Sequence, residues 1–486
     1  MKKLLLLAAL SLSIFATSCS SDNTDDGEIN PIVVPPASNV VEVSGDITAN
    51  TTWTADKIYL LKSNVYVTNN VTLTIEAGTI IKGDKATKGT LVITRGAKIN
   101  ATGTLDKPIV FTSNLAAGAR GQGDWGGVVL LGKAPNNVGP SVTIEGISDA
   151  SDKAKHGGTE PADNSGTMKY VRIEYAGIPL GPDNELNGLT FGSVGSGTTI
   201  DYVSVYRSGD DAFEWFGGSV NAKHLVAIAT FDDDFDTDNG FSGKIQFAVA
   251  QRLASTADVS GSNGFESDNL SSGSNVTPQT NAVFSNVTIL GPREGGSPAP
   301  AINANYQHAA QIRRNSAISI ANSVFAGYTE GIFYDDALPA AGATPNSSGN
   351  LLADNALFLN NLIYSCNSRS NQIKASNATA LAAVTAKITL NNINVFNDAI
   401  LAGAVYTDPY KFSADLAPAA RAGVPNFVLV SGSAALTGAD FTNTKYADAF
   451  FEKVAYKGAF GTADWTTGWV SYNPQTLPYT TPGAVK

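Results

Sequence analysis

The sequence contains few of the residues that most often build redox, metal and nucleophilic centres. Its 486 residues include two cysteines and three histidines, and only 15% of the residues are charged. Two cysteines cannot form the disulfide framework of a small secreted domain, and no spacing of histidine, cysteine and acidic residues suggests a zinc site. The sequence also lacks a glycine-rich phosphate loop and a G-x-S-x-G nucleophile elbow. Composition therefore argues against several common classes of enzyme.

The residues that are plentiful favour β-structure. The 47 glycines and the low content of charge suit an all-β protein with many turns better than a helical one. Hydrophobic residues make up 43% of the chain, which is enough for a packed core in a chain of this length. The formal net charge of −11 would repel nucleic acid and anionic lipid head groups, so we expect no nucleic-acid partner.

Residues 1–18 have the organisation of a signal peptide. Met1-Lys2-Lys3 precedes an apolar stretch from Leu4 to Ala16, which is too short to cross a bilayer as a stable anchor. The segment Ala16-Thr17-Ser18-Cys19 resembles a bacterial lipobox. This resemblance implies cleavage before Cys19 and attachment of lipid, including palmitate, to Cys19. An ordinary signal peptide that happens to contain a cysteine is the alternative.

Residues 19–40 are predicted to form a tether. The stretch from Ser20 to Glu28 is polar and acidic, the stretch from Pro31 to Pro36 is rich in proline, and neither can pack into a core. An acidic stretch directly after the lipid-bearing cysteine resembles the surface-export signals of Bacteroidetes lipoproteins. The resemblance implies a protein that is anchored through lipid in the cell outer membrane and faces the exterior.

The body of the chain repeats one pattern three times between Tyr202 and Asp268. Short apolar strands begin at residues 202, 224 and 246, and each is followed by a segment with a phenylalanine beside an acidic residue. Two successive steps of 22 residues indicate a solenoid, in which equivalent residues stack on one another. β-Propellers and sandwiches compete with this interpretation, but their antiparallel strands do not stack equivalent residues.

We therefore predict an all-β protein in which residues 41–400 fold as a parallel β-helix. From residue 401 the repeat fades. The open end of a β-helix exposes unpaired backbone groups that a distinct terminal segment commonly covers, so residues 401–486 are predicted to form a C-terminal cap. Within this cap we predict a short helix near Tyr446–Lys453.

Residues 41–270 resemble a group of Bacteroidetes and leptospiral outer-membrane lipoproteins with a β-helix of the pectate-lyase-like superfamily. The matching stretches are Thr74–Ile81, Arg95–Asn100, Pro108–Ser113, Gly123–Gly127, Asp232–Gly240 and, in the tail, Lys457–Trp469. The resemblance implies a right-handed coil and a location in the outer membrane. Members of the group are often found near TonB-dependent receptors, which implies a surface protein that takes part in nutrient uptake.

Acidic residues occupy equivalent positions in the three repeats. If Phe213, Phe235 and Phe265 point into the coil, the alternation of strand residues turns the next residue outward, and parallel strands lie about 4.8 Å apart. Like charges at that separation repel, so such a column requires a cation, a raised pKa or a basic neighbour. The column contains Glu214, Asp236 and Glu266.

We predict that this column binds Ca²⁺, because hard oxygen ligands suit that ion. Continuing the register places Gly192 before Glu214, and it places Arg313 and Tyr334 after Glu266, so that Arg313 lies beside Glu266. A solvated acidic face, in which Asp and Asn close turns, is the alternative. The predicted metal ligands are Glu214, Asp234, Asp236, Asp238, Glu266 and Asp268.

Two functional classes remain open on the sequence. The first, which we favour, is a non-catalytic surface binding protein, held to the membrane through lipid on Cys19, that delivers a ligand such as a glycan to a TonB-dependent receptor. The second is a Ca²⁺-dependent polysaccharide lyase or a glycoside hydrolase. Resemblance to the pectate-lyase-like superfamily implies a basic arginine beside the Ca²⁺ ligands, which makes Arg313 the candidate catalytic residue. The pairs Asp210-Asp211 and Asp232-Asp233 are similar to the aspartates of polygalacturonases, but the Gly-His-Gly motif of those enzymes is absent.

Overall fold

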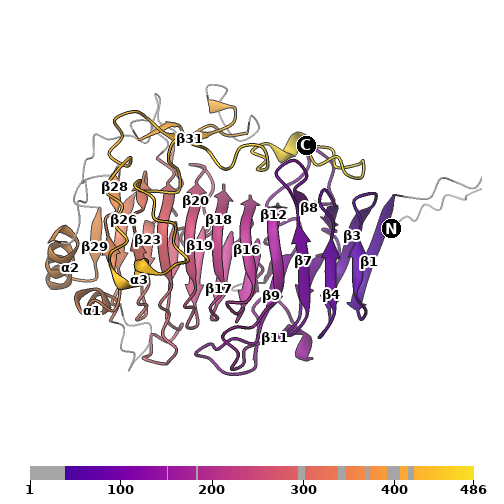
Figure 1. Cartoon of the computed structure of the whole chain (residues 1–486), viewed down its shortest axis with the longest axis horizontal. Helices are drawn as coiled ribbons and strands as arrows, with labels where there is room; N and C mark the ends of the chain where they lie inside the picture. Colours follow the sequence, from indigo (N-terminus) through magenta and orange to yellow (C-terminus); the bar gives the residue numbers. More distant parts are fainter. Residues whose placement is uncertain are drawn as a thin grey trace, which may run out of the picture. The chain divides into compact units, whose positions relative to one another are not determined.

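The body of the chain winds into a right-handed parallel β-helix, as predicted (Figure 1). The computed structural model describes residues 39–149, 151–181, 184–293, 301–337, 346–364, 366, 372–390, 405–413 and 421–486. The predicted signal peptide, Cys19 and almost all of the predicted tether lie outside the described residues. Within them, 25 strands join one continuous sheet.

Each turn of the β-helix contributes strands to three rows, and neighbouring strands of a row pair in parallel. The first row contains β2 (Thr51–Trp53), β4 (Thr72–Ile75), β7 (Lys98–Thr102), the first parts of β12 (Gly166–Glu174), β16 (Thr199–Tyr206), β18 (Asn221–Ile228), β20 (Lys244–Gln251) and β22 (Val283–Leu290), then β24 (Ser319–Ala321) and β27 (Phe358–Leu359). The second row contains the first parts of β1 (Val40–Ile47) and β3 (Ile58–Val67), β5 (Ile80–Gly83), β8 (Ile109–Ser113), the second parts of β12 to β22, then β25 (Val324–Ala326) and β28 (Leu362–Tyr364).

The third row carries the acidic residues. It begins with the ends of β1 and β3, and every later member is a short separate strand. Those strands are β6 (Thr90–Ile93), β9 (Gly127–Leu131), β15 (Leu189–Gly192), β17 (Phe213–Phe216), β19 (Phe235–Asp238), β21 (Phe265–Ser267), β23 (His308–Ile312), β26 (Glu330–Tyr334) and β29 (Ile373–Ala375).

Smaller elements lie outside the three rows. Antiparallel pairs are formed by β10 (Val142–Thr143) with β11 (Lys155–His156), β13 (Pro179–Gly181) with β14 (Asn184–Glu185), and β30 (Tyr406–Asp408) with β31 (Asn426–Leu429). The helices are α1 (Ser347–Leu352), α2 (Ala378–Leu390), α3 (Thr444–Ala447) and the short 3₁₀ turns η1 (Asp152–Ala154) and η5 (Pro474–Thr476). In the described part of the chain, no helix combines the length and the apolar composition that crossing a membrane requires.

The long strands bend between the first and second rows at residues in the left-handed region. Tyr202 and His224 have φ of 55° and 53°, and their rings stack with centroids 4.0 Å apart. Tyr170 and Phe247 extend the same stack at 4.5 Å from Tyr202 and 5.2 Å from His224. Stacking therefore compensates the backbone cost of these corners, and packing accounts for His224.

Rows of stacked apolar side chains fill the interior of the coil. Phe213, Phe235 and Phe265 are fully buried, and successive ring centroids lie 5.8 and 5.3 Å apart. The predicted inward orientation of these three residues is thereby confirmed. Each turn buries its apolar side chains against the next, which a single turn could not do alone.

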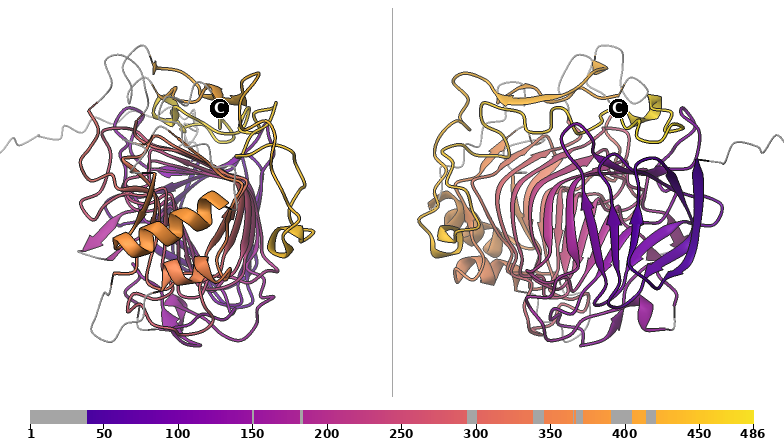
Figure 2. Two further views of the ribbon diagram at one scale, coloured as in Figure 1. Left: turned by 90° about the vertical axis from the view of Figure 1, so that its left-hand side faces the viewer. Right: turned by 45° about the vertical axis from the view of Figure 1, so that its right-hand side comes forward.

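Two helices cover the C-terminal end of the coil (Figure 2). The last described strand of the three rows, β29, ends at Ala375, and helix α2 follows it within the predicted β-helix range of residues 41–400. Val384 and Ile388 of α2 are buried in the same core as the strands. Helix α2 therefore covers the backbone edge that we had assigned to residues 401–486.

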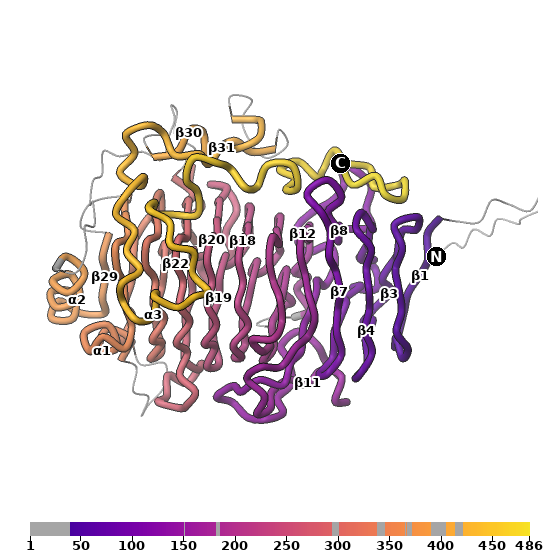
Figure 3. Tube along the Cα trace, viewed as in Figure 1, coloured from indigo at the N-terminus to yellow at the C-terminus, as the bar shows by residue number. Residues whose placement is uncertain are grey.

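The C-terminal strap, residues 421–486, runs back along the side of the β-helix and does not cap its end (Figure 3). The Lys445 ammonium donates to the Asn355 carbonyl beside the last turns, at 2.5 Å. Near the first turns the Arg120 guanidinium donates to the Pro474 carbonyl at 2.8 Å. The strap follows this path because its aromatic rings pack on the stacked corner rings; Trp469 meets Tyr202 edge-on at 5.9 Å. The predicted helix near 446–453 corresponds to α3, which is shorter and begins earlier.

Candidate metal centre

The outward face of the third row carries the predicted column of carboxylates. Glu214 pairs in register with Asp236, and Asp236 pairs with Glu266. The next outward positions are Phe216, Asp238 and Asp268, of which the first two are strand partners. The 22-residue spacing thus predicted the pairing of Glu214 with Asp236 correctly, and the repeated phenylalanine beside an acidic residue predicted the pairing of Asp236 with Glu266 across an insertion.

These strands form the floor of a cleft of about 760 Å³. Twelve carboxylates line the cleft together with two arginines, so its walls are strongly acidic. The carboxylates belong to Glu145, Glu185, Asp210, Asp211, Glu214, Asp232, Asp233, Asp236, Asp238, Asp258, Glu266 and Asp268, and the guanidinium groups to Arg313 and Arg314.

A ladder of hydrogen bonds positions the aspartates that precede the strands. Asp211 Oδ1 accepts from the Asp233 amide at 2.8 Å, and Asp233 Oδ1 accepts from the Asn263 amide. Asn263 Oδ1 in turn accepts from the His308 amide at 3.0 Å. Each side chain thereby satisfies a backbone donor of the next turn and fixes a carboxylate at the edge of the cleft.

These turn aspartates were not among the metal ligands predicted from the sequence. The sequence does indicate that they are equivalent, since Asp210-Asp211 and Asp232-Asp233 are separated by the same 22 residues as the strands. Glu145 and Glu185 carried no such signal. They reach the cleft from the loops after β9 and β12, which lie outside the repeat.

Three groups of carboxylates place their oxygens close enough to hold an ion. In each group, one oxygen of every residue lies within 4.8 Å of the oxygens of the other two residues. The first group contains Asp211, Glu214 and Asp236. Asp236 also belongs to the second group, with Asp233 and Glu266. The third group contains Asp210, Asp211 and Asp232.

Burial makes charge on these groups costly. Desolvation, followed by repulsion from Asp236, raises the pKa of Glu214 well above its usual value. Desolvation and the Asp233 carboxylate do the same to the pKa of Asp236. The pKa of Asp232 rises to about 6 through burial and Asp258, and that of Asp268 rises to about 8 through burial and Asp238. A bound cation would offset both causes by supplying positive charge.

Two arginines neutralise one end of the cleft. Arg313 Nε donates to Asp268 Oδ1 at 2.9 Å, and its Nη2 donates to Glu266. Arg314 Nη1 donates to Asp268 Oδ2 at 2.5 Å. At the other end, within the described residues, no salt bridge is formed by Asp211, Glu214, Asp233 or Asp236. Cation-binding capacity therefore concentrates around Asp236.

The predicted register is wrong on both sides of the three repeats. Thr190, not Gly192, is the strand partner of Glu214. Gln311, not Arg313, lies opposite Glu266, and Arg313 reaches back from beyond the end of β23. Tyr334 is fully buried in the core and does not point outward. Loops of unequal length separate these strands, so counting residues could not fix their alignment.

The structure also separates Asp234 from the other predicted ligands. Strand alternation begins only at Phe235, so Asp234 lies in the turn and points away from the cleft. Its Oδ2 accepts from Arg252 Nε at 2.8 Å, and both side chains are fully buried. Arg252 also donates to the Thr230 carbonyl at 2.9 Å and to the Asn263 carbonyl. The pair therefore supports the turns that hold the aspartate ladder.

In the earlier turns the same outward face is apolar and covered. Tyr66, Val92, Val129 and Leu131 pack there against Ile144 and other residues from the loops after β9 and β12. Phe216 belongs to the same cluster and marks its boundary with the acidic cleft. The covered and open halves of one face explain why the cleft begins at β17.

Fold and site together define the class of this protein as a single-chain parallel β-helix with a polar cleft on one lateral face. The chain belongs to the family of pectate-lyase-like β-helix domains, whose model matches residues 45–399. Among solved structures it is similar to the Dettilon tailspike protein, at 11% identity and a TM-score of 0.26. That similarity covers 67% of this chain and 62% of the tailspike chain, which is less than two thirds of the latter. No curated protein matches.

Proposed function

We propose that this protein is a non-catalytic surface binding protein whose β-helix holds Ca²⁺ in the acidic cleft. The observation that carries the proposal is Asp236, whose carboxylate is shared by two groups of oxygens. Asp236 Oδ1 is buried and has no hydrogen-bond partner within the described residues. A buried, unsatisfied carboxylate oxygen among other carboxylates is costly unless a cation binds it.

The donor set favours Ca²⁺ over other common ions. Every candidate ligand is a carboxylate oxygen, and neither histidine nor cysteine lines the cleft. Ca²⁺ takes six to eight oxygen ligands in flexible geometry, whereas zinc prefers nitrogen and sulfur, and Mg²⁺ demands a near-ideal octahedron. The remaining coordination positions would face the open cleft. Oxygen-rich ligands such as a glycan could occupy them, because hydroxyl and carboxylate oxygens suit the same ion.

The proposed location is the outer face of the cell outer membrane, with lipid on Cys19. Acylation supplies more than one hydrocarbon chain, which is sufficient for stable anchoring. A β-helix held at that surface could present its ligand to a TonB-dependent receptor. Support for this part of the proposal comes from the lipobox and the acidic tether of the sequence.

Removal of the cation tests the proposal directly. Binding to the folded state alone would stabilise it by roughly 2.7 kcal/mol at a hundredfold excess over the dissociation constant. We expect EDTA to lower the Tm of the wild type, and Asp236→Asn to remove most of that difference. Asp106→Asn is the matched control, since the Asp106 side chain is 86% exposed and lies outside the cleft. Identical melting in EDTA and millimolar Ca²⁺, with no heat of Ca²⁺ binding in calorimetry, would refute the cation site.

An enzymatic function is the second candidate, and the raised pKa values favour it. A carboxylic acid whose pKa lies near neutrality, such as Asp232 at about 6, can serve as a general acid. Arg313, the candidate base of a lyase, is held by two carboxylates in this structure. Incubation with polygalacturonate and alginate, with and without Ca²⁺, distinguishes the candidates. Unsaturated products or new reducing ends, lost in Arg313→Ala, would replace the binding role with catalysis.

A further inference from the structure

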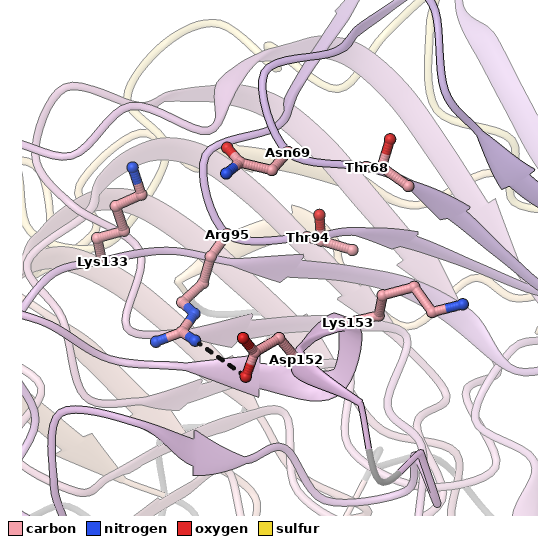
Figure 4. Close-up of a pocket in the computed structure, with 7 residues that line it drawn as sticks. All are labelled: Thr68, Asn69, Thr94, Arg95, Lys133, Asp152 and Lys153. Carbon is pink, nitrogen blue, oxygen red and sulfur yellow. Dashed lines mark ion pairs between the residues drawn. The ribbon is translucent and has the colours of Figure 1, made fainter.

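A second cavity lies in the first turns of the β-helix and encloses about 410 Å³ (Figure 4). The turns after β3, β6 and β9 supply Thr68–Asn69, Thr94–Arg95 and Lys133, and the loop after β9 supplies Asp152–Lys153. Strands β3, β6 and β9 are neighbours in the third row, so these turns stack on one another. No residue of the acidic cleft contributes to this cavity, and its role is independent of the proposed function.

The charge of this cavity is opposite to that of the protein as a whole. Three basic side chains and one carboxylate line it, in a chain whose net charge is −11. The Lys153 ammonium already has two partners within the protein: it lies 3.0 Å from Asp46 Oδ1 and 4.4 Å from the centroid of the Tyr66 ring. Figure 4 shows Lys153 pointing away from Arg95. The cations that can act on a ligand are therefore Arg95 and Lys133.

Backbone carbonyls hold one side of the Arg95 guanidinium in place. Its Nη1 donates to the carbonyls of Pro140 and Gly157 at 3.3 and 3.2 Å. Its Nη2 lies 3.7 Å from Asp152 Oδ1, and the Asp152 side chain is 85% exposed. An exposed ion pair of this kind contributes little, so an incoming anion can displace Asp152 from a guanidinium that is already oriented.

Lys133 provides the second positive charge. In the part of the chain that the structure describes, its ammonium forms no hydrogen bond or salt bridge, and its charge partly offsets the rise that burial causes in the pKa of Asp163. Gly96, at φ +78°, packs against Asn69 and Lys133: a Cβ there would lie 2.3 Å from Asn69 Oδ1 and 3.2 Å from Lys133 Cε. The absence of a side chain at this position therefore lets Asn69 and Lys133 approach the same turn.

We propose that this cavity binds a small ligand through one oxyanion group, namely a phosphate, a sulfate ester or a carboxylate. Arginine presents a planar fork to such groups and lysine a mobile point charge. The volume falls in the range of about 300–1,000 Å³ of small-molecule sites, so more than a bare ion fits. The Thr68 and Thr94 hydroxyls donate to the carbonyls of Ile47 and Val67, which leaves their oxygens free to accept from ligand hydroxyls.

Calorimetric titration of the full chain with inorganic phosphate tests this site. Passing the protein and the buffer over a chelating resin beforehand excludes calcium phosphate without adding a competing carboxylate, and chloride keeps the ionic strength constant. We expect Lys133→Gln to weaken binding by roughly three- to tenfold, the loss of one charged hydrogen-bond donor. Asp152→Asn should strengthen binding, because it removes the carboxylate that competes for Arg95. Lys98→Gln is the matched control on the exposed side of β7 and should leave binding unchanged.

Further probes identify the source of the anion. Glucose 6-phosphate and glucuronate should compete with phosphate, whereas neutral glucose should not. Tighter binding of the sugar phosphate than of phosphate assigns the site to an anionic sugar, and equal binding assigns it to the free anion. If no anionic probe binds, or if Lys133→Gln and Lys98→Gln weaken binding equally, the proposal is overturned.

Discussion

Each carboxylate in the cleft acquires its character from the groups it faces. Glu266 and Asp268 face Arg313 and are partly neutralised within the protein. Glu214 and Asp236 face other carboxylates, and burial raises the pKa of both. Asp236 and Glu266 occupy the same position of the repeat, but their electrostatic surroundings are therefore different. This difference is why the proposed ion lies nearer to Asp236 than to the arginines.

The pH dependence of stability should show these shifts. Burial raises the pKa of Asp268 to about 8 and that of Asp232 to about 6. An acid whose pKa is higher in the folded state than in the unfolded state binds more protons when the protein is folded. Its contribution to stability is therefore complete below the unfolded-state pKa, and it is lost as the pH rises through the folded-state pKa. In EDTA we expect the Tm to fall between about pH 5 and about pH 9. Millimolar Ca²⁺ should flatten this profile by replacing protons, whereas a Tm that rises with pH in EDTA would contradict the shifts.

The buried pair of Asp234 and Arg252 offers a second test at this scale. Arg252→Met leaves a buried carboxylate without its partner, which should lower the free energy of unfolding by about 3–5 kcal/mol. The double variant with Asp234→Asn should recover part of that loss, because no unpaired charge remains. Urea denaturation followed by circular dichroism measures both. Equal destabilisation of the single and double variants would show that the pairing of charges does not matter here.

Different elements cover different surfaces of the β-helix. Helix α2 covers the last turn, and the C-terminal strap covers the corner between the first and second rows. The strap ends in a buried polar cluster, in which Arg172 Nη2 donates to the Tyr479 hydroxyl at 2.8 Å and to the Val485 carbonyl at 2.7 Å. The Tyr479 hydroxyl donates to Glu174 Oε1 at 3.0 Å. The last residues of the chain thus satisfy charges that belong to the second row.

Truncation after Asn473 should therefore be strongly destabilising. It removes the Tyr479 hydroxyl and the carbonyls that accept from Arg120 and Arg172, and it exposes the buried Arg172–Glu174 ion pair. We expect a loss of about 3 kcal/mol or more in the free energy of unfolding. Tyr479→Phe, which deletes only the hydroxyl, should cost about 1 kcal/mol. Thermal unfolding gives the order of the three proteins. Ca²⁺ affinity should be unchanged in both variants, because the strap does not line the acidic cleft.

For the whole molecule, one lateral face of the coil has two parts. Its first turns are covered by loops over an apolar surface, and its later turns are open and acidic. This arrangement places a polar site on the side of the β-helix, whose N-terminal end follows the predicted tether in sequence. A lipid anchor at the start of the tether would keep the β-helix at the membrane surface.

Substitution of Cys19 tests the proposed lipid anchor. Cys19→Ala should shift the protein from the membrane fraction to the soluble fraction and abolish labelling with palmitate, because the acyl chains on Cys19 supply the proposed attachment to the membrane. Ser20→Ala is the matched control beside the acylation site. A Cys19→Ala protein that still sediments with membranes and still incorporates palmitate would rule out the lipobox. Protease treatment of intact cells tests the orientation separately.

The repeated pattern in the sequence predicts the β-helix and the alignment of Glu214, Asp236 and Glu266. Glu214 and Asp236 are one 22-residue period apart, and Glu266 follows after 30 residues beside a phenylalanine as in the other two copies, so equivalent positions pair once the backbone hydrogen bonds form. The direction of Asp234, the alignment of Arg313 and the approach of Glu145 and Glu185 to the cleft could be seen only in the folded protein. Those features depend on turns and on loops of unequal length, whose path is set by what they pack against and not by any local period.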